Sequence, residues 1–239
     1  MVKLGVNLDH VATIRQQRYT PYPDMLTAIK ISEESGADSI TMHLREDRRH
    51  IQFEDIKIAR KNIKTKLNLE MAATEEMCVI ANQIKPDFIC IVPEKRQELT
   101  TEGGLDVKKY FSKIKNVVSE LSESNAVISL FIEPDIEIIG LAKDLDVGAI
   151  ELHTGKYAEA KNEDKKYYLD KIKTASDYAN DIALVVNAGH GLDYTNVKEI
   201  ARIDNINELN IGHSIIAESI FLGLSEAIKK MKNLIESSK

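Results

Sequence analysis

The stretch Ala183-Leu-Val-Val-Asn-Ala-Gly-His-Gly191 decides the fold of this chain, because it joins a strand-like run to a polar turn. The run is aliphatic and β-branched, which is typical of a parallel strand covered by helices. We predict a strand over Ala183–Asn187, with His190 between two glycines beyond its downstream end. In a (β/α)8 barrel all such strand ends lie on one face, and that face carries the chemistry.

All six histidines of the chain can be placed near the downstream end of a predicted strand. Each can be assigned to the downstream end of a predicted strand or to the turn after it: His10, His43, His50, His153, His190 and His213. A short echo, Asn-x-(Asp or Gly)-His, occurs at Asn7–His10, Asn187–His190 and Asn210–His213. The first, seventh and eighth strands of a closed barrel are neighbours, so we expect the echoes to build one polar patch.

Seven further runs along the chain have the same aliphatic and β-branched character. They are Leu4–Leu8, Ser39–Leu44, Leu67–Met71, Phe88–Val92, Val127–Ile132, Ala149–His153 and Glu208–Ile211. Between the strands, apolar residues recur at helical spacing. The clearest helical segments are Asp24–Ser35, Thr74–Lys85, Asp106–Glu123 and Ser214–Ile235.

Strands that alternate with helices at roughly 30-residue intervals predict an α/β fold, a (β/α)8 TIM barrel. No linker-like segment divides the chain, so we expect a single domain over residues 1–239, with room for extra short helices. The competing architecture is an open doubly wound sheet. The chain has no GxGxxG turn after its first strand to support that alternative.

Composition excludes several classes of function. The 239 residues carry 32 basic and 38 acidic side chains, a net charge of −6, so we expect no nucleic-acid partner. No run approaches the roughly 20 apolar residues that span a bilayer, and the N-terminus lacks a signal-peptide pattern. Cys78 and Cys90 fall in a helical and a strand pattern and make no disulfide framework. We expect no membrane partner and a cytoplasmic setting.

Polar residues inside apolar strands indicate the chemistry, because burying them without partners is costly. Glu70 lies in the third strand run, and Glu151 and His153 alternate along the sixth, where they share a face. A lone histidine at a strand end is more often structural than catalytic. Several such residues converging on one face favour general acid–base catalysis instead. Burial of Glu70 should raise its pKa and suit it to proton transfer.

Two glycine turns and an arginine cluster indicate bound anions. Gly189–Gly191 and Gly212–Ser214 follow the seventh and eighth strands, where barrels often bind phosphate at a helix N-terminus. Tight turns alone are the alternative, and Ser214 would begin the last helix. Arg45, Arg48 and Arg49 can hold a small anion, or can form a solvated loop paired with their acidic neighbours.

The polar segment Pro93–Gly104 follows the fourth strand and ends in a glycine pair. It suits a lid that closes over a substrate, although a long solvated loop is the alternative. Histidines and carboxylates on one face can also hold Zn²⁺. No His-x-His pair ends the first strand and no helix carries His-x-x-x-His, so we expect no metal. Lysine Schiff-base chemistry is disfavoured, because Lys95 and Lys156 lie in loops.

Several motifs resemble the pyridoxine 5′-phosphate synthase family, from the first strand to the last. They are Asn7–His10, His43–His50, Asn68–Met71, Val92–Glu98, Thr101–Gly104, Asn187–Gly191 and Glu208–His213. The resemblance implies a cofactor-free (β/α)8 enzyme of vitamin B6 biosynthesis, typically an octamer. Such an enzyme condenses 1-deoxy-D-xylulose 5-phosphate with 3-amino-2-oxopropyl phosphate to pyridoxine 5′-phosphate, phosphate and water.

The resemblance also implies roles for particular residues. His43 and Glu70 would be general bases, His190 a proton donor, and Glu151 a stabiliser of charged transition states. The substrate-binding residues would be Asn7, Asp9, His10, Arg18, Arg45, His50, Thr100, Gly191, Gly212 and His213. His153 takes no role from the family; it either points away from the site or supports Glu151.

The chain departs from the family pattern near Arg18. Tyr19 follows it in place of the usual glycine, and Met25 follows Asp24 in place of the usual proline. These changes bear on the conformation of the Arg18 loop and on its role. Two other functions use the same side chains: a metal-dependent hydrolase, and a non-catalytic binder of phosphorylated metabolites.

Overall fold

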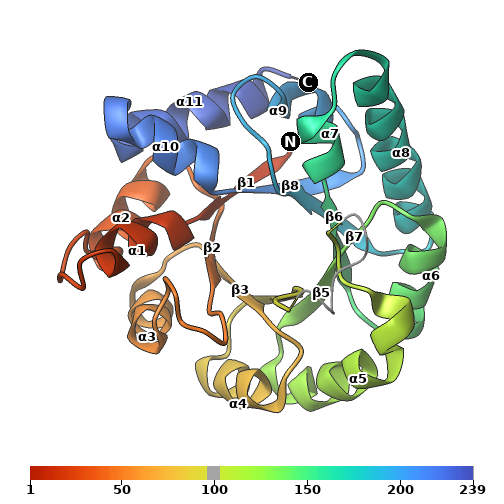
Figure 1. Ribbon diagram of the computed structural model, residues 1–239, viewed down its shortest axis with the longest axis horizontal. Helices are drawn as coiled ribbons and strands as arrows, with labels where there is room; N and C mark the ends of the chain where they lie inside the picture. Colours follow the sequence, from red (N-terminus) through yellow and green to blue (C-terminus); the bar gives the residue numbers. More distant parts are fainter. Residues whose placement is uncertain (96–102, 239) are drawn as a thin grey trace.

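The computed structural model describes residues 1–95 and 103–238. Within them, eight parallel strands close into a barrel in sequence order, with β8 paired to β1 (Figure 1). The strands are β1 Lys3–Asn7, β2 Ser39–His43, β3 Lys66–Met71, β4 Phe88–Ile91, β5 Val127–Ile132, β6 Ala149–His153, β7 Val185–Gly189 and β8 Ile206–Ile211. The predicted (β/α)8 barrel is confirmed, and the open doubly wound sheet is wrong.

Helices surround the barrel on its outer side (Figure 1). They are α1 Asp9–Gln16, α2 Met25–Glu34, α3 Phe53–Asn62, α4 Glu75–Ile84, α5 Val107–Glu120, α6 Ile136–Asp144, α7 Gly155–Glu159, α8 Asn162–Asp181, α9 Val197–Ala201, α10 His213–Leu222 and α11 Leu224–Glu236, with a 3-10 turn at Leu121–Ser124. The room expected for extra short helices is taken by α1, α7 and α9. No helix of the described chain has the length and apolar character needed to cross a membrane.

The predicted strand in the stretch that decides the fold is shifted by two residues. Ala183 has a φ of 57°, so it closes the turn after α8 instead of opening the strand. At the other end, Gly189 still pairs with His153 of β6 and Asn210 of β8. The strand is therefore Val185–Gly189, and His190 follows it directly.

The predicted helices are confirmed, with one exception. Asp24, Thr74 and Asp106 lie just before α2, α4 and α5, where each side chain accepts a first-turn backbone N–H. The exception is Ser214–Ile235, which is two helices. Gly223 lies between them with φ 78° and ψ 153°, a conformation open essentially only to glycine. The first of the two begins at His213, one residue earlier than predicted.

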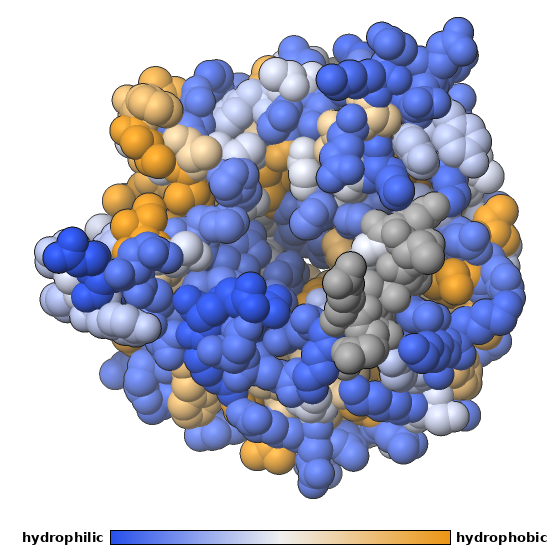
Figure 2. All heavy atoms as spheres, viewed as in Figure 1, coloured by the Kyte–Doolittle hydropathy of each residue, from blue (hydrophilic) through white to orange (hydrophobic). Residues whose placement is uncertain are grey.

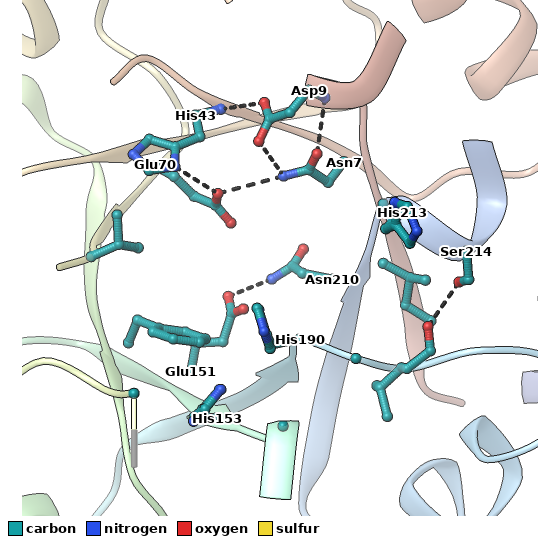
Figure 3. A pocket seen from close by; sticks show the side chains of 18 of the residues that line it. Asn7, Asp9, His43, Glu70, Glu151, His153, His190, Asn210, His213 and Ser214 are labelled. Carbon is teal, nitrogen blue, oxygen red and sulfur yellow. Dashed lines mark hydrogen bonds and ion pairs between the residues drawn. The ribbon is translucent and has the colours of Figure 1, made fainter. Parts of the chain in front are cut away.

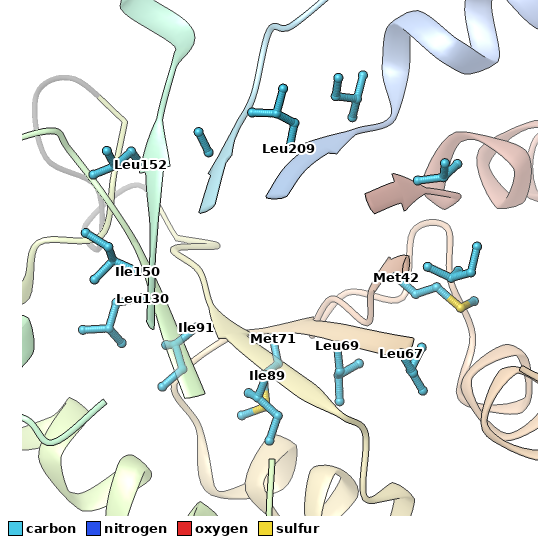
Figure 4. Close-up of a cluster of buried hydrophobic side chains, with 14 of the residues drawn as sticks. Met42, Leu67, Leu69, Met71, Ile89, Ile91, Leu130, Ile150, Leu152 and Leu209 are labelled. Carbon is cyan, nitrogen blue, oxygen red and sulfur yellow. The ribbon is translucent and has the colours of Figure 1, made fainter. Parts of the chain in front are cut away.

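Alternation along the strands separates the apolar layer from the interior of the barrel. In β3, Leu67, Leu69 and Met71 are fully buried and belong to the apolar cluster of Figure 4. The residues between them are polar. The Asn68 side chain donates a hydrogen bond to the Thr41 hydroxyl inside the barrel, and Glu70 lines a cavity at the carboxyl ends of the strands. Because side chains alternate along each strand, the aliphatic ones pack in the buried core and the polar ones face the barrel interior and its open end.

Candidate active site

A cavity of about 1080 Å³ opens at the carboxyl ends of the strands. Figure 2 shows it as a hollow at the centre of a mostly hydrophilic face. All six histidines line it, which confirms their predicted convergence. The other predicted site residues that line it are Asn7, Asp9, Arg45, Glu70, Glu151, Gly191 and Gly212. Arg18 is not among the lining residues and is exposed after α1. Thr100 lies outside the described residues.

A hydrogen-bond network joins the ends of β1, β2 and β3 (Figure 3). Asn7 donates its amide to Asp9 Oδ2 at 2.9 Å and to Glu70 Oε2 at 3.4 Å. Asp9 Oδ1 accepts the backbone N–H of His43 at 2.8 Å. The Nδ1 atom of His43 then lies 3.9 Å from Glu70 Oε2. The network holds a carboxyl group and an imidazole side by side at the wall of the cavity.

The carboxyl groups of this network have raised pKa values. Burial raises the pKa of Glu70 well above its usual value, and Asp9 and Glu151 raise it further. Burial also raises the pKa of Asp9, against the opposing influence of His43. The direction expected for Glu70 from the sequence is confirmed. A carboxyl group whose pKa is moved toward neutrality can both give and take a proton.

Glu94 is a functional candidate that sequence reasoning left inside the predicted lid. Its Oε1 lies 2.9 Å from His43 Nε2, and its Oε2 accepts the backbone N–H of Glu46 at 2.9 Å. Burial opposes ionisation, but the bonds from His43 and Glu46 outweigh it and lower the pKa of Glu94. The sequence feature that could have identified Glu94 as a site residue is its position shortly after β4. Residues 96–102 of the predicted lid lie outside the described residues.

Glu151 forms a second polar centre, deeper in the barrel. It accepts the side-chain amide of Asn210 at 2.7 Å, and Thr41 donates to the amide oxygen of Asn210 at 2.9 Å. Burial raises the pKa of Glu151 to about 7, with Asn210 opposing that shift. A Cβ at position 189 would lie 2.4 Å from Glu151 Oε1, so Gly189 is required for the carboxylate to lie against β7.

His153 corrects both alternatives drawn from the sequence. It lines the cavity instead of pointing away, and its Nδ1 bonds Glu133 at 2.9 Å, not Glu151. Glu133 follows β5 and was missed, because one glutamate after an apolar strand is not distinctive. The His153 ring lies 4.9 Å from the ring of His190. Burial lowers the pKa of His190, and His153 lowers it further.

The turns after β7 and β8 have the geometry expected of an anion site. Gly191 has a φ of 75°, and the N-terminus of α10 lies at the cavity, which Gly212, His213 and Ser214 line. The Ser214 hydroxyl donates to the carbonyl of Leu192 and so ties the two turns together. The rings of His10 and His213 lie 4.8 Å apart on the same side. Phosphate binding itself stays a prediction.

The three clustered arginines, Arg45, Arg48 and Arg49, have different surroundings. Arg45 lines the cavity and lies 3.9 Å from Glu94. Arg48 pairs with Glu76 at 2.6 Å and Arg49 pairs with Asp47 at 2.5 Å, both toward solvent. The solvated-loop reading therefore holds for Arg48 and Arg49. On the cavity side His50 remains beside Arg45, and burial lowers its pKa to about 4, which favours its neutral form.

Asp9, His43 and Glu70 are the group within the described chain whose atoms could hold a metal ion, since one ligand atom from each lies within 4.8 Å of the others. The donor atoms already have partners, however. Asp9 accepts hydrogen bonds from Asn7 and His43, and the second ring nitrogen of His43 faces Glu94. The expected absence of a metal stays a prediction, with this group as the place to test it.

Comparison with known proteins supplies a family. A family model described as "Pyridoxal phosphate biosynthesis protein PdxJ" matches residues 4–237. The chain is 55% identical to a pyridoxine 5′-phosphate synthase of Prochlorococcus marinus subsp. pastoris, over 98% of this chain and 99% of the relative. It is 51% identical to the synthase of Legionella pneumophila strain Corby, over 99% and 96%.

Solved structures of lower similarity share the fold. KGPDC from Streptococcus mutans matches with a TM-score of 0.67 at 13% identity, over 99% of this chain and 98% of that one. Monomers of the dimeric phosphoribosylantranilate isomerase from Thermotoga maritima match with a TM-score of 0.59 at 12% identity, over 99% and 100%. At such identity the likeness extends to the barrel alone.

Proposed function

The chain belongs to the family of pyridoxal phosphate biosynthesis proteins described as PdxJ, and from that membership we infer that it is an enzyme that makes pyridoxine 5′-phosphate in vitamin B6 biosynthesis. We propose that its substrates are 1-deoxy-D-xylulose 5-phosphate and 3-amino-2-oxopropyl phosphate. The products are pyridoxine 5′-phosphate, phosphate and water. The observation that carries this proposal is the convergence of His43, Glu70, Glu151 and His190 on one cavity.

Joining the amine of one substrate to the ketone of the other moves protons repeatedly between carbon, nitrogen and oxygen. We assign His43 and Glu70 as the general bases. Glu70 supports this role because burial and two neighbouring carboxyl groups raise its pKa toward the working range of the reaction. His43 is held by Glu94 on one ring nitrogen, which leaves the other directed toward Glu70.

We assign His190 as the proton donor and Glu151 as the group that stabilises positive charge in the transition states. The lowered pKa of His190 favours its neutral form before a substrate binds. A phosphorylated substrate brings negative charge into the cavity, which raises the pKa of a nearby histidine and loads it with a proton. Substrate binding would therefore favour the protonated form of His190 that acts as the proton donor. Glu151, with a pKa of about 7, can develop negative charge as cationic intermediates form.

Two phosphate groups require two anion sites. We propose that Gly191, Gly212, His213 and the N-terminus of α10 bind one phosphate, since backbone N–H groups and a helix dipole favour an anion there. We propose that Arg45, with His10 and His50 nearby, binds the other. Asn7 and Asp9 would orient the reacting groups between them. Arg18 and Thr100 remain proposed contacts by family resemblance alone.

We further propose that the whole chain, residues 1–239, works as one barrel domain in a homo-octamer in the cytoplasm. Exposed apolar side chains support an assembly: Ile220, Phe221 and Leu222 on α10 are 70%, 84% and 46% exposed. Ile14 is 51% exposed on α1, which contacts α10. Figure 2 shows hydrophobic side chains gathered over this edge of the molecule. F221D should lower the mass measured by sedimentation; an unchanged mass would reject α10 as an interface.

Purified protein incubated with both phosphorylated substrates tests the activity. We expect pyridoxine 5′-phosphate, detected by mass spectrometry, without added metal or cofactor. Folded protein that forms no product would overturn the proposal. The group formed by Asp9, His43 and Glu70 favours a metal-dependent hydrolase as the second candidate. Exhaustive chelation should leave synthesis unchanged, whereas loss of activity that Zn²⁺ restores would favour the hydrolase.

A further inference from the structure

Glu133 and His153 form a buried pair on the cavity wall, beside the histidine assigned as proton donor. Glu133 Oε1 lies 2.9 Å from His153 Nδ1, and the two residues are 5% and 7% exposed. Glu133 follows β5 directly and His153 ends β6, so neighbouring strands present the two side chains to each other. Neither residue has a part in the substrate contacts or proton transfers assigned above.

The His153 ring packs directly on the ring of His190. Their centroids are 4.9 Å apart, with the planes tilted by 57°. The Phe131 ring lies 5.1 Å from that of His153 and 6.3 Å from that of His190, so it contacts both from one side. Figure 3 shows His153 and His190 beside each other in the lower part of the view. The two imidazoles therefore share one packing environment, so a change in the position or charge of one ring affects the other.

Two glycines and a backbone donor prevent the His153 ring from turning. A Cβ at Gly103 would lie 2.8 Å from Cε1 of His153, and one at Gly155 would lie 2.6 Å from Nε2. The main chain at both glycines therefore lies close to the Cε1–Nε2 edge of the ring, which leaves no room for a larger residue there. Glu133 Oε1 also accepts the N–H of Gly104 at 2.7 Å. The carboxylate is thus oriented by the backbone, and it orients the ring in turn.

The bond to Glu133 decides which nitrogen of His153 is available. A carboxylate can only accept hydrogen bonds, so Nδ1 is the donor and carries the proton. Nε2 is then the nitrogen that can gain or lose a proton at the edge near Gly155 and His190. We propose that Glu133 and His153 are positioning residues for His190, which hold its ring and set the local charge against which it exchanges its proton.

The charges around His190 give this proposal a direction. Among the described residues, the titratable groups that act on it are His153 of β6, Glu159 of α7 and Glu133 after β5. Lys156 of α7 and Asp193 after β7 line the same cavity. Burial lowers the pKa of His190 most, and His153 lowers it further, whereas Glu159 and Glu133 raise it. Because the His153 imidazole lowers the pKa of His190, we expect its removal to raise that pKa.

Histidine-labelled NMR of the full-length protein, without substrates, tests the coupling. His190→Asn identifies the His190 signal by its loss. His153→Asn keeps an N–H donor toward Glu133 but removes the imidazole, and we expect it to raise the pKa of His190 by about one unit. Phe131→Leu is the matched control, since it removes packing from both rings without changing any charge. It should leave the titration of His190 within about 0.3 units of the wild type.

Turnover supplies the second measurement. This inference rests on the proposed donor role of His190, and kinetics separate the two. We expect His153→Asn to move the pH profile of kcat as far as it moves the titration of His190. We expect Glu133→Gln to lower kcat about tenfold with little change in KM.

Unaltered titration of His190 in His153→Asn would overturn the inference, whatever happens to the rate. So would a shift of equal size in Phe131→Leu, because the effect would then be one of packing. Full turnover in His190→Asn would instead reject the donor role within the proposed function. The NMR result would still decide whether the pair governs the charge of His190.

Discussion

The Nε2 atom of His43 lies 2.9 Å from Oε1 of Glu94, in a pair that links the turns after β2 and β4. The Glu94 side chain is only 3% exposed, and its second oxygen accepts the backbone N–H of Glu46. The pair decides which nitrogen of His43 turns toward Glu70. A carboxylate that orients a histidine in this way maintains the tautomer needed for proton transfer.

Glu94→Gln should therefore lower kcat by about 10- to 100-fold with a small change in KM, since the amide cannot replace the charged acceptor. Steady-state kinetics of product formation measure it. Glu76→Gln is the control, because Glu76 pairs with Arg48 at the surface and its side chain is 65% exposed. Equal losses in the two variants would contradict the positioning role.

Glu70→Gln should retain substrate binding and lower kcat by about 10²- to 10⁴-fold, because the amide keeps the shape of the side chain but cannot accept a proton. In the wild type, only the ionised carboxylate is a base, so the rate should increase with pH through the raised pKa of Glu70. Exposed Glu75 at the start of α4 provides the control substitution, Glu75→Gln. Undiminished turnover in Glu70→Gln would reject the assignment.

Glu151 makes a prediction about stability. Burial raises its pKa from 4.5 to about 7, so the folded state binds more protons than the unfolded state between these values. Stability is therefore lost as the pH rises through this window. Glu151→Gln keeps the acceptor for Asn210 and removes the titration. Its stability relative to the wild type should increase by about 2–3 kcal/mol between pH 4 and pH 8 in urea unfolding. A difference independent of pH would disprove this account.

The ion pair between Arg15 and Asp55 supports the loop that carries His50. It is bidentate, with N–O distances of 2.6 and 2.7 Å, and the Asp55 side chain is 6% exposed. Asp55→Ala leaves a nearly buried guanidinium unpaired and should cost about 3–5 kcal/mol. Glu199→Ala, which breaks an exposed pair with Arg202, should cost at most about 1 kcal/mol. Comparable unfolding free energies for both variants would argue against this difference.

Substitution by alanine should lower the stability of the protein at Gly223 and raise it at Gly140. Gly223 separates α10 from α11 at φ 78°, and a Cβ there would contact nothing within 4 Å. The cost of Gly223→Ala is therefore backbone strain alone, about 1–3 kcal/mol. Gly140 lies inside α6, and its Cβ would reach only ordinary contact with Tyr178. Gly140→Ala should stabilise the protein by about 0.5–1 kcal/mol. Thermal unfolding measures both, and a stabilising Gly223→Ala would refute the strain argument.

Strand positions were predictable because aliphatic and β-branched runs are a local property of the chain. Val127–Ile132 and Ala149–His153 match the observed β5 and β6 residue for residue. The errors lie where backbone conformation overrides side-chain pattern. Ala183 adopts a left-handed conformation that displaces β7, and Gly223 divides a continuous apolar periodicity into two helices.

Site residues were predictable where a polar group interrupts or ends a strand. Glu70, Glu151 and His190 stand out for that reason, and all three line the cavity. Glu94 and Glu133 do not stand out, because glutamates in loops are common. Each acquires its importance from a histidine 51 or 20 residues away along the chain. Arg18 shows the converse, since a motif position was expected in the site and the side chain is exposed.

The amino-acid sequence was enough to predict the alternation of strands and helices, the face on which the histidines gather, and those polar residues that interrupt or end a strand, since each follows from local pattern and barrel geometry. Only the tertiary structure decided how those residues pair: His43 with Glu94, Glu151 with Asn210, and His153 with Glu133. The reason is that pairing depends on distances of about 3 Å between side chains that are far apart in the sequence. Burial and neighbouring charge, which shift the pKa values, likewise exist only once the barrel has closed.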